Sequence, residues 1–252
     1  MSDRDDRVVV GIHPVRELLR AGRAVREVLV ADRSSSEALD EIRTRAAGAG
    51  VPIRPLDDDR AEALAPGQVH QGVVALAPAF PFQSLDQVLA RGGGDQPLLL
   101  VAFDQVTDPH NVGSVARTAE ALGAHALVLP ERRTASITPT VEKAAAGALA
   151  HLPVVSPVNL AKSLEKCRDA GLWLVGLEAG TGTAVADCNL LTEPLVLVVG
   201  AEGTGLRPLT RTRCDVLVEL PLHGHVDSYN ASVAAAMALY AIDRARRSGG
   251  GT

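Results

Sequence analysis

Apolar stretches in the second half of the sequence constrain the fold more than any other feature. The clearest is LVLVVG at 195–200, which lacks the polar alternation of a half-exposed strand. Strands of this kind are buried on both faces, as in a parallel sheet that helices cover on both sides. Ligands of such sheets bind outside the carboxyl ends of the strands. We therefore predict an α/β domain with strands at 98–103, 126–129, 172–177, 195–199 and 216–220, and candidate sites in the loops after the first, fourth and fifth.

The first half of the sequence has the pattern of a smaller α/β domain. Short β-like runs alternate with helical patterns that end on glycine, at AG (21–22) and GAG (48–50). The predicted strands are 8–11, 26–31, 51–56 and 72–77, and the predicted helices are 13–22, 34–50 and 57–64.

The stretch 79–96 contains Pro81 and the run Gly92–Gly94, which indicate a connector with a short helix inside it. We predict a substrate-binding domain at 1–78, a linker at 79–96 and a second domain at 97–252. A surface excursion within a single domain is the alternative.

Composition narrows the possible functions. No apolar run approaches the ~20 residues of a membrane span, and the charged start MSDRDDR is unlike a secretory signal, so a cytoplasmic protein is expected. The net charge of −5 argues against binding nucleic acid through bulk charge. Three widely spaced cysteines form no disulfide framework. His223 and His225 lack a third ligand nearby in sequence, so no metal is expected.

The segment DQVTDPHNVGSVARTAE at 104–120 is the first candidate site. Asp108-Pro109 favours a turn, and Asn111 is expected to cap the helix that follows. Ser114 and Arg117 are three residues apart and therefore share a face of that helix. A capped helix with a solvated arginine is the simpler interpretation of this segment alone.

The segment VGAEGTGL at 199–206 is the second candidate site. It has the order strand, glycine-rich loop, helix, but not the spacing G-x-G-x-x-G of dinucleotide-binding loops. Glu202 would repel a phosphate and could instead accept hydrogen bonds, so a nucleoside or a cation fits this loop better than a pyrophosphate. A tight turn between strand and helix is the alternative.

The segment ELPLHGHVDSYNASVA at 219–234 is the third candidate site. A strand ends at Leu220-Pro221, and the polar loop that follows could offer backbone hydrogen bonds to a flat heterocycle. Ser228 or Asn230 is expected to cap the last helix, 232–247; a capped helix without a ligand is again the alternative.

In this order and spacing, the three segments resemble the motifs of the SpoU/TrmH-type RNA 2′-O-ribose methyltransferases. DPHNVGSVARTAEALGA is similar to the first motif, LVLVVGAEGTGLRPLTRTRCD to the second and ELPLHGHVDSYNASVA to the third. VGIHPVRELL and VHQGVVA resemble the small RNA-binding domain of the family. The resemblance covers nearly the whole chain and is strongest to the bacterial type that methylates a guanosine of 23S ribosomal RNA.

The resemblance implies a C-terminal domain tied in a deep trefoil knot and an N-terminal domain like ribosomal protein L30e. It also implies a homodimer formed through the C-terminal domain, with the active site at the subunit interface, and S-adenosylmethionine as the cofactor. A transfer-RNA target and a non-catalytic RNA-binding protein remain alternatives. A nicotinamide-dependent enzyme is disfavoured, because no G-x-G-x-x-G follows the first strand.

The resemblance also implies roles for individual residues. Arg117 would orient the ribose hydroxyl or a neighbouring phosphate and stabilise developing negative charge, because a guanidinium stays charged and is a poor general base. Tyr229 stands where the family has an aliphatic residue. The catalytic set is Arg117, Asn111, Glu202, Ser228 and Asn230; the cofactor set is Gly176, Gly200, Leu220, Leu222 and Tyr229; the RNA-binding set is His13, Arg16, His70 and Gln71.

Overall fold

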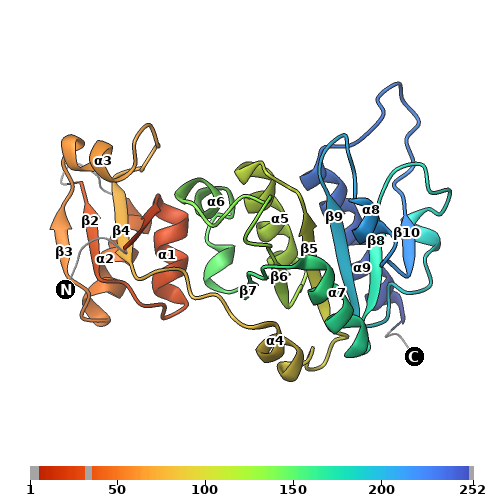
Figure 1. Ribbon diagram of the computed structural model, residues 1–252. Coiled ribbons are helices and arrows are strands. Elements are labelled where there is room, and N and C mark those ends of the chain that lie inside the picture. The colour runs from red at the N-terminus through yellow and green to blue at the C-terminus, as the bar shows by residue number, and fades with distance from the viewer. Residues whose placement is uncertain (1–5, 32–35, 250–252) are drawn as a thin grey trace. The chain divides into compact units, whose positions relative to one another are not determined.

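The computed structural model describes residues 6–31 and 36–249, and it forms two compact units. One unit comprises Met1–Pro81 together with Ile137–His151, and the other comprises Phe82–Ser136 together with Leu152–Thr252. Most of their helices and strands are labelled in Figure 1. The predicted functional division into 1–78, 79–96 and 97–252 stays a prediction.

The first unit is built on a four-stranded sheet in the order β1-β4-β2-β3. β4 is antiparallel to both β1 and β2, whereas β3 is parallel to β2. The strands are β1 (Arg7–Val10), β2 (Glu27–Val30), β3 (Ile53–Pro55) and β4 (Val73–Ala77), and the helices are α1 (Ile12–Arg20), α2 (Glu37–Gly48), α3 (Asp58–Leu64), α6 (Pro139–Ala144) and the 3-10 turn η1 (Ala148–Ala150).

Alternating side chains of this sheet supply a core on each of its faces. Val28 and Val30 pack with Leu18 of α1 and Ile42 of α2, whereas Leu29 packs with Ala61 of α3. The predicted helices are confirmed in α1, α2 and α3. The start of the predicted helix 34–50 lies outside the described residues, and the helix begins after its cap Ser36.

The second unit contains the predicted parallel sheet, with the strand order β10-β8-β9-β5-β6-β7. All six strands are parallel, and β9 and β5 at the centre are buried throughout. The strands are β5 (Leu99–Asp104), β6 (Ala126–Val128), β7 (Val154–Val155), β8 (Trp173–Leu177), β9 (Leu195–Gly200) and β10 (Val216–Val218). The sequence did not predict the two-residue β7.

Helices cover this sheet with apolar faces. Leu160, Leu164 and Cys167 of α7 pack on Leu100 and Val196, and α5 packs against α9. The helices are α4 (Leu85–Arg91), α5 (Pro109–Ala121), α7 (Leu160–Asp169), α8 (Pro208–Arg211), α9 (Ala231–Gly249) and the 3-10 turn η2 (Val185–Asp187). Among residues 6–31 and 36–249, no helix has the length and hydropathy needed to cross a bilayer. The trefoil knot stays a prediction.

Candidate functional site

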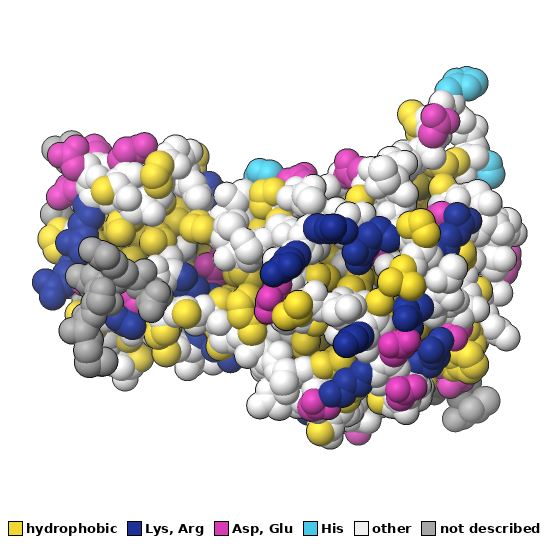
Figure 2. Space-filling model, in the orientation of Figure 1, with side chains coloured by type: hydrophobic (Ala, Val, Ile, Leu, Met, Phe, Trp, Pro, Cys, Tyr) yellow, Lys and Arg dark blue, Asp and Glu magenta, His cyan; other side chains and the backbone are white. Residues whose placement is uncertain are grey.

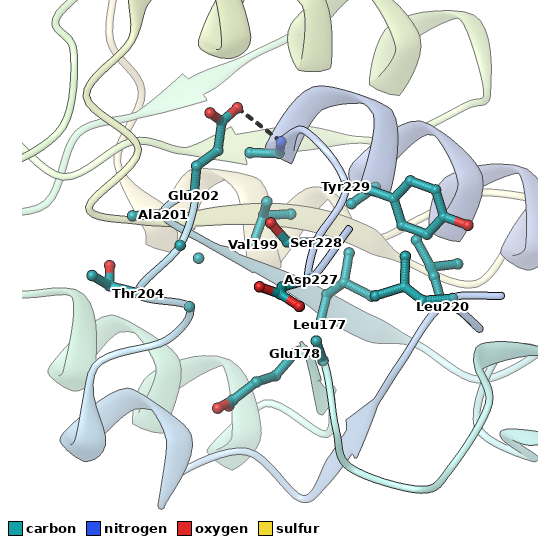
Figure 3. Close-up of a pocket in the computed structure, with 17 residues that line it drawn as sticks. Leu177, Glu178, Val199, Ala201, Glu202, Thr204, Leu220, Asp227, Ser228 and Tyr229 are labelled. Atoms are coloured by element: carbon teal, nitrogen blue, oxygen red, sulfur yellow. Dashed lines mark hydrogen bonds between the residues drawn. The ribbon is translucent and has the colours of Figure 1, made fainter. Parts of the chain in front are cut away.

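A pocket of about 470 Å³ opens at the carboxyl ends of β8, β9 and β10 (Figure 3). This is the edge of the sheet at which a parallel α/β fold is expected to bind its ligand. The walls come from three segments: Leu177–Ala179 after β8, Val199–Gly205 after β9, and the stretch around Leu220–Ala231 that leads into α9.

Glu202 connects all three sequence motifs. Its Oε1 accepts hydrogen bonds from Asn111 Nδ2 (2.8 Å), from the backbone N–H of Ala231 (3.1 Å) and from Asn230 Nδ2. Asn230 Nδ2 also donates to Asn111 Oδ1 at 3.0 Å. Figure 3 shows the Glu202 carboxylate pointing toward the first turn of α9. A negative charge is favourable there, because the amino end of a helix carries a partial positive charge.

The glycine-rich loop after β9 is a tight, internally bonded turn. Ala201 and Gly205 exchange backbone hydrogen bonds of 3.2 and 2.9 Å. Gly203 and Gly205 have φ angles of +75° and +65°, which glycine adopts at low cost. A Cβ on Gly200 would overlap the backbone of Gly205. The backbone of this loop therefore requires glycine at these positions whether or not a ligand binds there.

A buried carboxylate holds Arg207, the residue that follows this loop and precedes α8. Asp104, at the end of β5, is fully buried. Its Oδ2 accepts a 2.8 Å hydrogen bond from the backbone N–H of Arg207, and its Oδ1 accepts another from Arg207 Nε. A buried charge is tolerated only when it is paired in this way. Asp104 thus ties Arg207, which follows the glycine-rich loop, to the carboxyl end of β5.

The prediction that Asn111 caps α5 is wrong. The cap is Asp108, whose side chain accepts from the N–H of His110 at 2.9 Å, and Pro109 occupies the first helical position. Asn111 is buried inside the first turn and turns its amide to Glu202 instead. For α9, the cap is Asn230, whose Oδ1 accepts from the N–H of Ser232 at 3.0 Å.

Four of the five residues of the predicted cofactor set line the pocket: Gly200, Leu220, Leu222 and Tyr229. The Tyr229 hydroxyl donates a 3.0 Å hydrogen bond to the carbonyl of Pro221. Gly176 does not line it. It lies inside β8, where a Cβ would meet the side chains of Leu206, Cys214 and Leu217.

The predicted catalytic set is only partly brought together. Asn111, Glu202 and Asn230 form one cluster, and Ser228 is an exposed residue of the pocket wall. Arg117 lies on the exposed side of α5 and is not part of that wall. Its side chain has no hydrogen bond or ion pair in the part of the chain that the structure describes.

The predicted RNA-binding residues gather near the start of α1 in the first unit. Gln71 Oε1 accepts from the N–H of Ile12 at 3.2 Å, and Arg16 Nη2 lies 3.1 Å from Nδ1 of the exposed His13. His70 Nδ1 accepts from the N–H of Gly72 at 3.2 Å. The two N-terminal motifs therefore meet in space. Gln71 and His70 make local structural contacts, whereas the His13 ring remains accessible.

Sequence reasoning missed Glu178, Ala179, Thr204 and Asp227 of the pocket wall. Glu178 and Ala179 follow β8, and the rule that ligands bind at the carboxyl ends of strands applied to that loop as well. This loop also carries two glycines at positive φ, Gly180 and Gly182, so the stretch EAGTGT at 178–183 held a second signal that could have marked it. Asp227 stood within the third motif but could not be distinguished from its polar neighbours.

The structure offers no clustered metal ligands. Within the described ranges, no group of three or more His, Cys, Asp or Glu side chains is placed to hold a metal ion. Cys167, Cys188 and Cys214 are free thiols. Burial raises the pKa of Cys167 and of Cys214 to about 12, which makes both poor nucleophiles.

Comparisons with known proteins agree with this geometry. The model of the SpoU rRNA Methylase family matches residues 98–240, and the model described as RNA 2′-O ribose methyltransferase substrate binding matches residues 8–83. A putative TrmH family tRNA/rRNA methyltransferase of Bacillus subtilis is 38% identical over 250 residues, covering 98% of each chain. An uncharacterized tRNA/rRNA methyltransferase of Mycobacterium avium is 39% identical, covering 95% of this chain and 77% of its own length.

The crystal structure of the SpoU methyltransferase AviRb from Streptomyces viridochromogenes, in complex with AdoMet, matches with a TM-score of 0.81 and 31% identity, covering 97% of this chain and 92% of that chain. The predicted family is therefore confirmed. The chain belongs to the SpoU family and is an RNA methyltransferase.

Proposed function

We propose that this protein transfers a methyl group from S-adenosylmethionine to a ribose 2′-hydroxyl of structured RNA. The observation that carries the proposal is the Glu202 cluster. It joins residues from all three motifs beside a pocket at the carboxyl ends of β8, β9 and β10.

The pocket fits the cofactor in size and chemistry. Its volume of about 470 Å³ lies within the ~300–1,000 Å³ of small-molecule sites. Leu177, Leu220 and the Tyr229 ring offer apolar surface for an adenine, and no Lys or Arg lines the wall to attract a phosphate. In this proposal, backbone groups of Gly200, Leu220 and Tyr229 hold the nucleoside, with Leu222 beside them; all four line the pocket. When bound, the cofactor supplies an electrophilic methyl group.

The chain's own residues position the acceptor. Arg117 orients the ribose hydroxyl or an adjacent phosphate and stabilises charge that develops on oxygen. Asn111, Glu202 and Asn230 form a rigid polar wall, and Ser228 completes it at the surface. A water molecule carries the proton away. Alignment of the two substrates supplies much of the rate enhancement.

A homodimer explains why Arg117 lies outside the pocket wall. Val233, Met237 and Tyr240 stand on α9 at helical spacing and are 47%, 40% and 57% exposed, respectively. Exposed apolar rows of this kind mark interaction surfaces. We propose that this row packs on a second copy, so that the active site forms at the interface of the two subunits.

The first unit selects the RNA, with His13 and Arg16 as its direct contacts and His70 and Gln71 shaping the surface. Figure 2 shows Lys and Arg side chains with Asp and Glu side chains among them on one face of the second unit. Ion pairs of this unit include Lys166–Asp86 and Arg211–Glu178. Recognition of the RNA therefore depends on where the basic side chains lie more than on the net charge of the protein. We propose a guanosine of 23S ribosomal RNA in the cytoplasm as the target, with a transfer RNA as the alternative.

The first test is a calorimetric titration with S-adenosylmethionine, followed by methylation of ribosomal and transfer RNA. Methylated riboses are located as positions that resist alkaline cleavage, because a blocked 2′-oxygen cannot attack the neighbouring phosphate. Arg117→Ala should bind the cofactor and lose methyl transfer, whereas Lys162→Ala on the exposed side of α7 should retain both. Cofactor binding with no methylation of any RNA would favour a non-catalytic RNA-binding protein.

A further inference from the structure

Acidic side chains line the pocket, and no basic side chain does. Of its 17 lining residues, all within the described chain, Glu178, Glu202 and Asp227 are acidic and none is Lys, Arg or His. Figure 3 shows the Asp227 carboxylate pointing toward the middle of the lining residues, whereas that of Glu202 points away from it. The three acids are therefore not equivalent toward a bound ligand.

The three acidic side chains also differ in their hydrogen-bond and ion-pair partners. Glu202 is occupied by three donors from Asn111, Asn230 and Ala231. Glu178 has an ion pair of 3.2 Å from its Oε1 to the exposed Arg211, but its Oε2 is buried and has no hydrogen-bond partner. Asp227 has no hydrogen bond or ion pair within the described residues. Asp227 thus keeps its whole charge for a ligand, whereas Glu178 keeps one oxygen without a partner.

A positively charged ligand would supply the missing partner. S-adenosylmethionine carries one net positive charge, from a sulfonium, an ammonium and a carboxylate. S-adenosylhomocysteine, which remains after methyl transfer, has lost the sulfonium charge and is neutral overall. The two molecules otherwise have nearly the same shape, so contacts with the adenine and the ribose cannot distinguish them.

We propose that Glu178 and Asp227 select the cofactor over the spent product by charge. This inference rests on the proposed function of the pocket. The two carboxylates attract the ligand that carries the sulfonium and lose that attraction when the methyl group leaves. The selectivity favours product release and exchange for fresh cofactor. Since Asp227 is exposed and Glu178 already pairs with Arg211, each contributes only about a two- to fivefold preference.

The test is calorimetric titration of the full-length protein with three ligands: S-adenosylmethionine, S-adenosylhomocysteine and sinefungin, an analogue with an ammonium group near the position of the sulfonium. Glu178→Gln and Asp227→Asn should each lower the affinity for S-adenosylmethionine and for sinefungin about two- to fivefold. The affinity for S-adenosylhomocysteine should not change. Added salt should reduce the preference of the wild type. Asp95→Asn, which makes the same charge change in the segment before β5 at the opposite edge of the sheet, is the matched control.

An equal loss of affinity for all three ligands would overturn the proposal, because the carboxylates would then affect the shape of the pocket and not its preference for a charged ligand. Unchanged affinities in both variants would overturn it as well. Asp227 is exposed on a loop, so its variant tests the idea even if Glu178→Gln disturbs the fold. Failure of the wild type to bind any of the three ligands would instead contradict the proposed function.

Discussion

The side-chain amide of Asn111 donates a 2.8 Å hydrogen bond to Glu202, although the two residues lie 91 positions apart in the sequence. Asn111 is buried, and its partner carries a charge. Hydrogen bonds to charged groups contribute ~1.5–3 kcal/mol, and more is lost when the remaining partner stays unsatisfied. This bond therefore ties the start of α5 to the glycine-rich loop of the pocket.

A double-mutant cycle on Asn111 and Glu202 measures this connection. We expect Asn111→Ala and Glu202→Ala each to lower the free energy of unfolding by about 2 kcal/mol, and the double variant to lose less than the sum. Urea denaturation monitored by circular dichroism gives the three values. Ser114→Ala, a half-buried position in the same helix with no side-chain bond to Glu202, is the control. Strict additivity would show that the two residues do not interact.

Tyr229 provides a second test, at the mouth of the pocket. Its hydroxyl bond to the Pro221 carbonyl closes the loop between them, and Tyr229 itself lines the pocket. Tyr229→Phe removes this bond and keeps the ring. We expect a faster dissociation of S-adenosylmethionine, by about fivefold for a bond of ~1 kcal/mol, with little change in stability. Stopped-flow displacement measures the rate.

Thr44→Val is the control for this experiment, because the Thr44 hydroxyl also donates to a backbone carbonyl, that of Asp40 at 2.9 Å, but lies in α2 of the first unit. The same dissociation rate in Tyr229→Phe as in the wild type would mean that the loop stays closed without the hydroxyl. A lower affinity in Tyr229→Leu alone would assign the effect to the ring.

The sequence was most informative where the pattern is local. LVLVVG and its neighbours predicted buried parallel strands, because burial on both faces removes polar residues from every position of a strand. The three motifs likewise predicted the loops that form most of the pocket. Local pattern could not show that Asn111 turns away from the helix cap toward Glu202, since that contact depends on how β5 and β9 pair.

Two further features were not predictable for the same reason. The segment Ile137–His151 belongs to the first compact unit although it lies within the second half of the chain. It is held there by long-range contacts, such as the hydrogen bond from Arg23 Nε to the Ala150 carbonyl. The position of Glu178 depends on β10 pairing beside β8, since its N–H donates to the Val218 carbonyl at 2.9 Å, and these two strands are not consecutive in the sequence.

Arg246 is expected to be the most important single arginine for the stability of α9. Its guanidinium donates to three backbone carbonyls, those of Pro97 (2.7 Å), Glu193 (2.8 Å) and Leu191 (3.1 Å). Arg246→Ala leaves these acceptors without their donor and should cost about 2–4 kcal/mol of unfolding free energy. Arg246→Lys should recover only part of this, because an ammonium lacks the planar fork.

The adjacent Arg247 is the matched control for Arg246, because it is exposed and bonds only to Asp243 one turn away on α9. Arg247→Ala should leave the urea midpoint almost unchanged, since exposed pairs of this kind contribute little. Equal effects of the two alanine variants would show that the three carbonyl contacts are not formed in solution.

Glu142 should make the stability of the first unit depend on pH. Burial raises the pKa of this carboxyl to about 7, even though Arg7 lies beside it. A carboxyl with a higher pKa in the folded state than in the unfolded state binds its proton more tightly when folded. Its contribution is therefore fully present below pH ~4.5 and is lost as the pH rises toward 7.

Glu142→Gln tests this prediction, because glutamine resembles the protonated side chain. The variant should match the wild type near pH 5 and become relatively more stable by pH 8, by an amount on the order of 2 kcal/mol. Glu41→Gln should show the opposite dependence. Hydrogen bonds from Arg20 and Arg45 lower the pKa of Glu41 to about 2, so its carboxylate stabilises the folded state fully above pH ~4.5. The variant should therefore be less stable than the wild type above that pH. Urea titrations of the three proteins from pH ~2 to pH ~8 measure both effects. A difference between Glu142→Gln and the wild type that stays constant with pH would show that Glu142 remains ionised in its ion pair with Arg7.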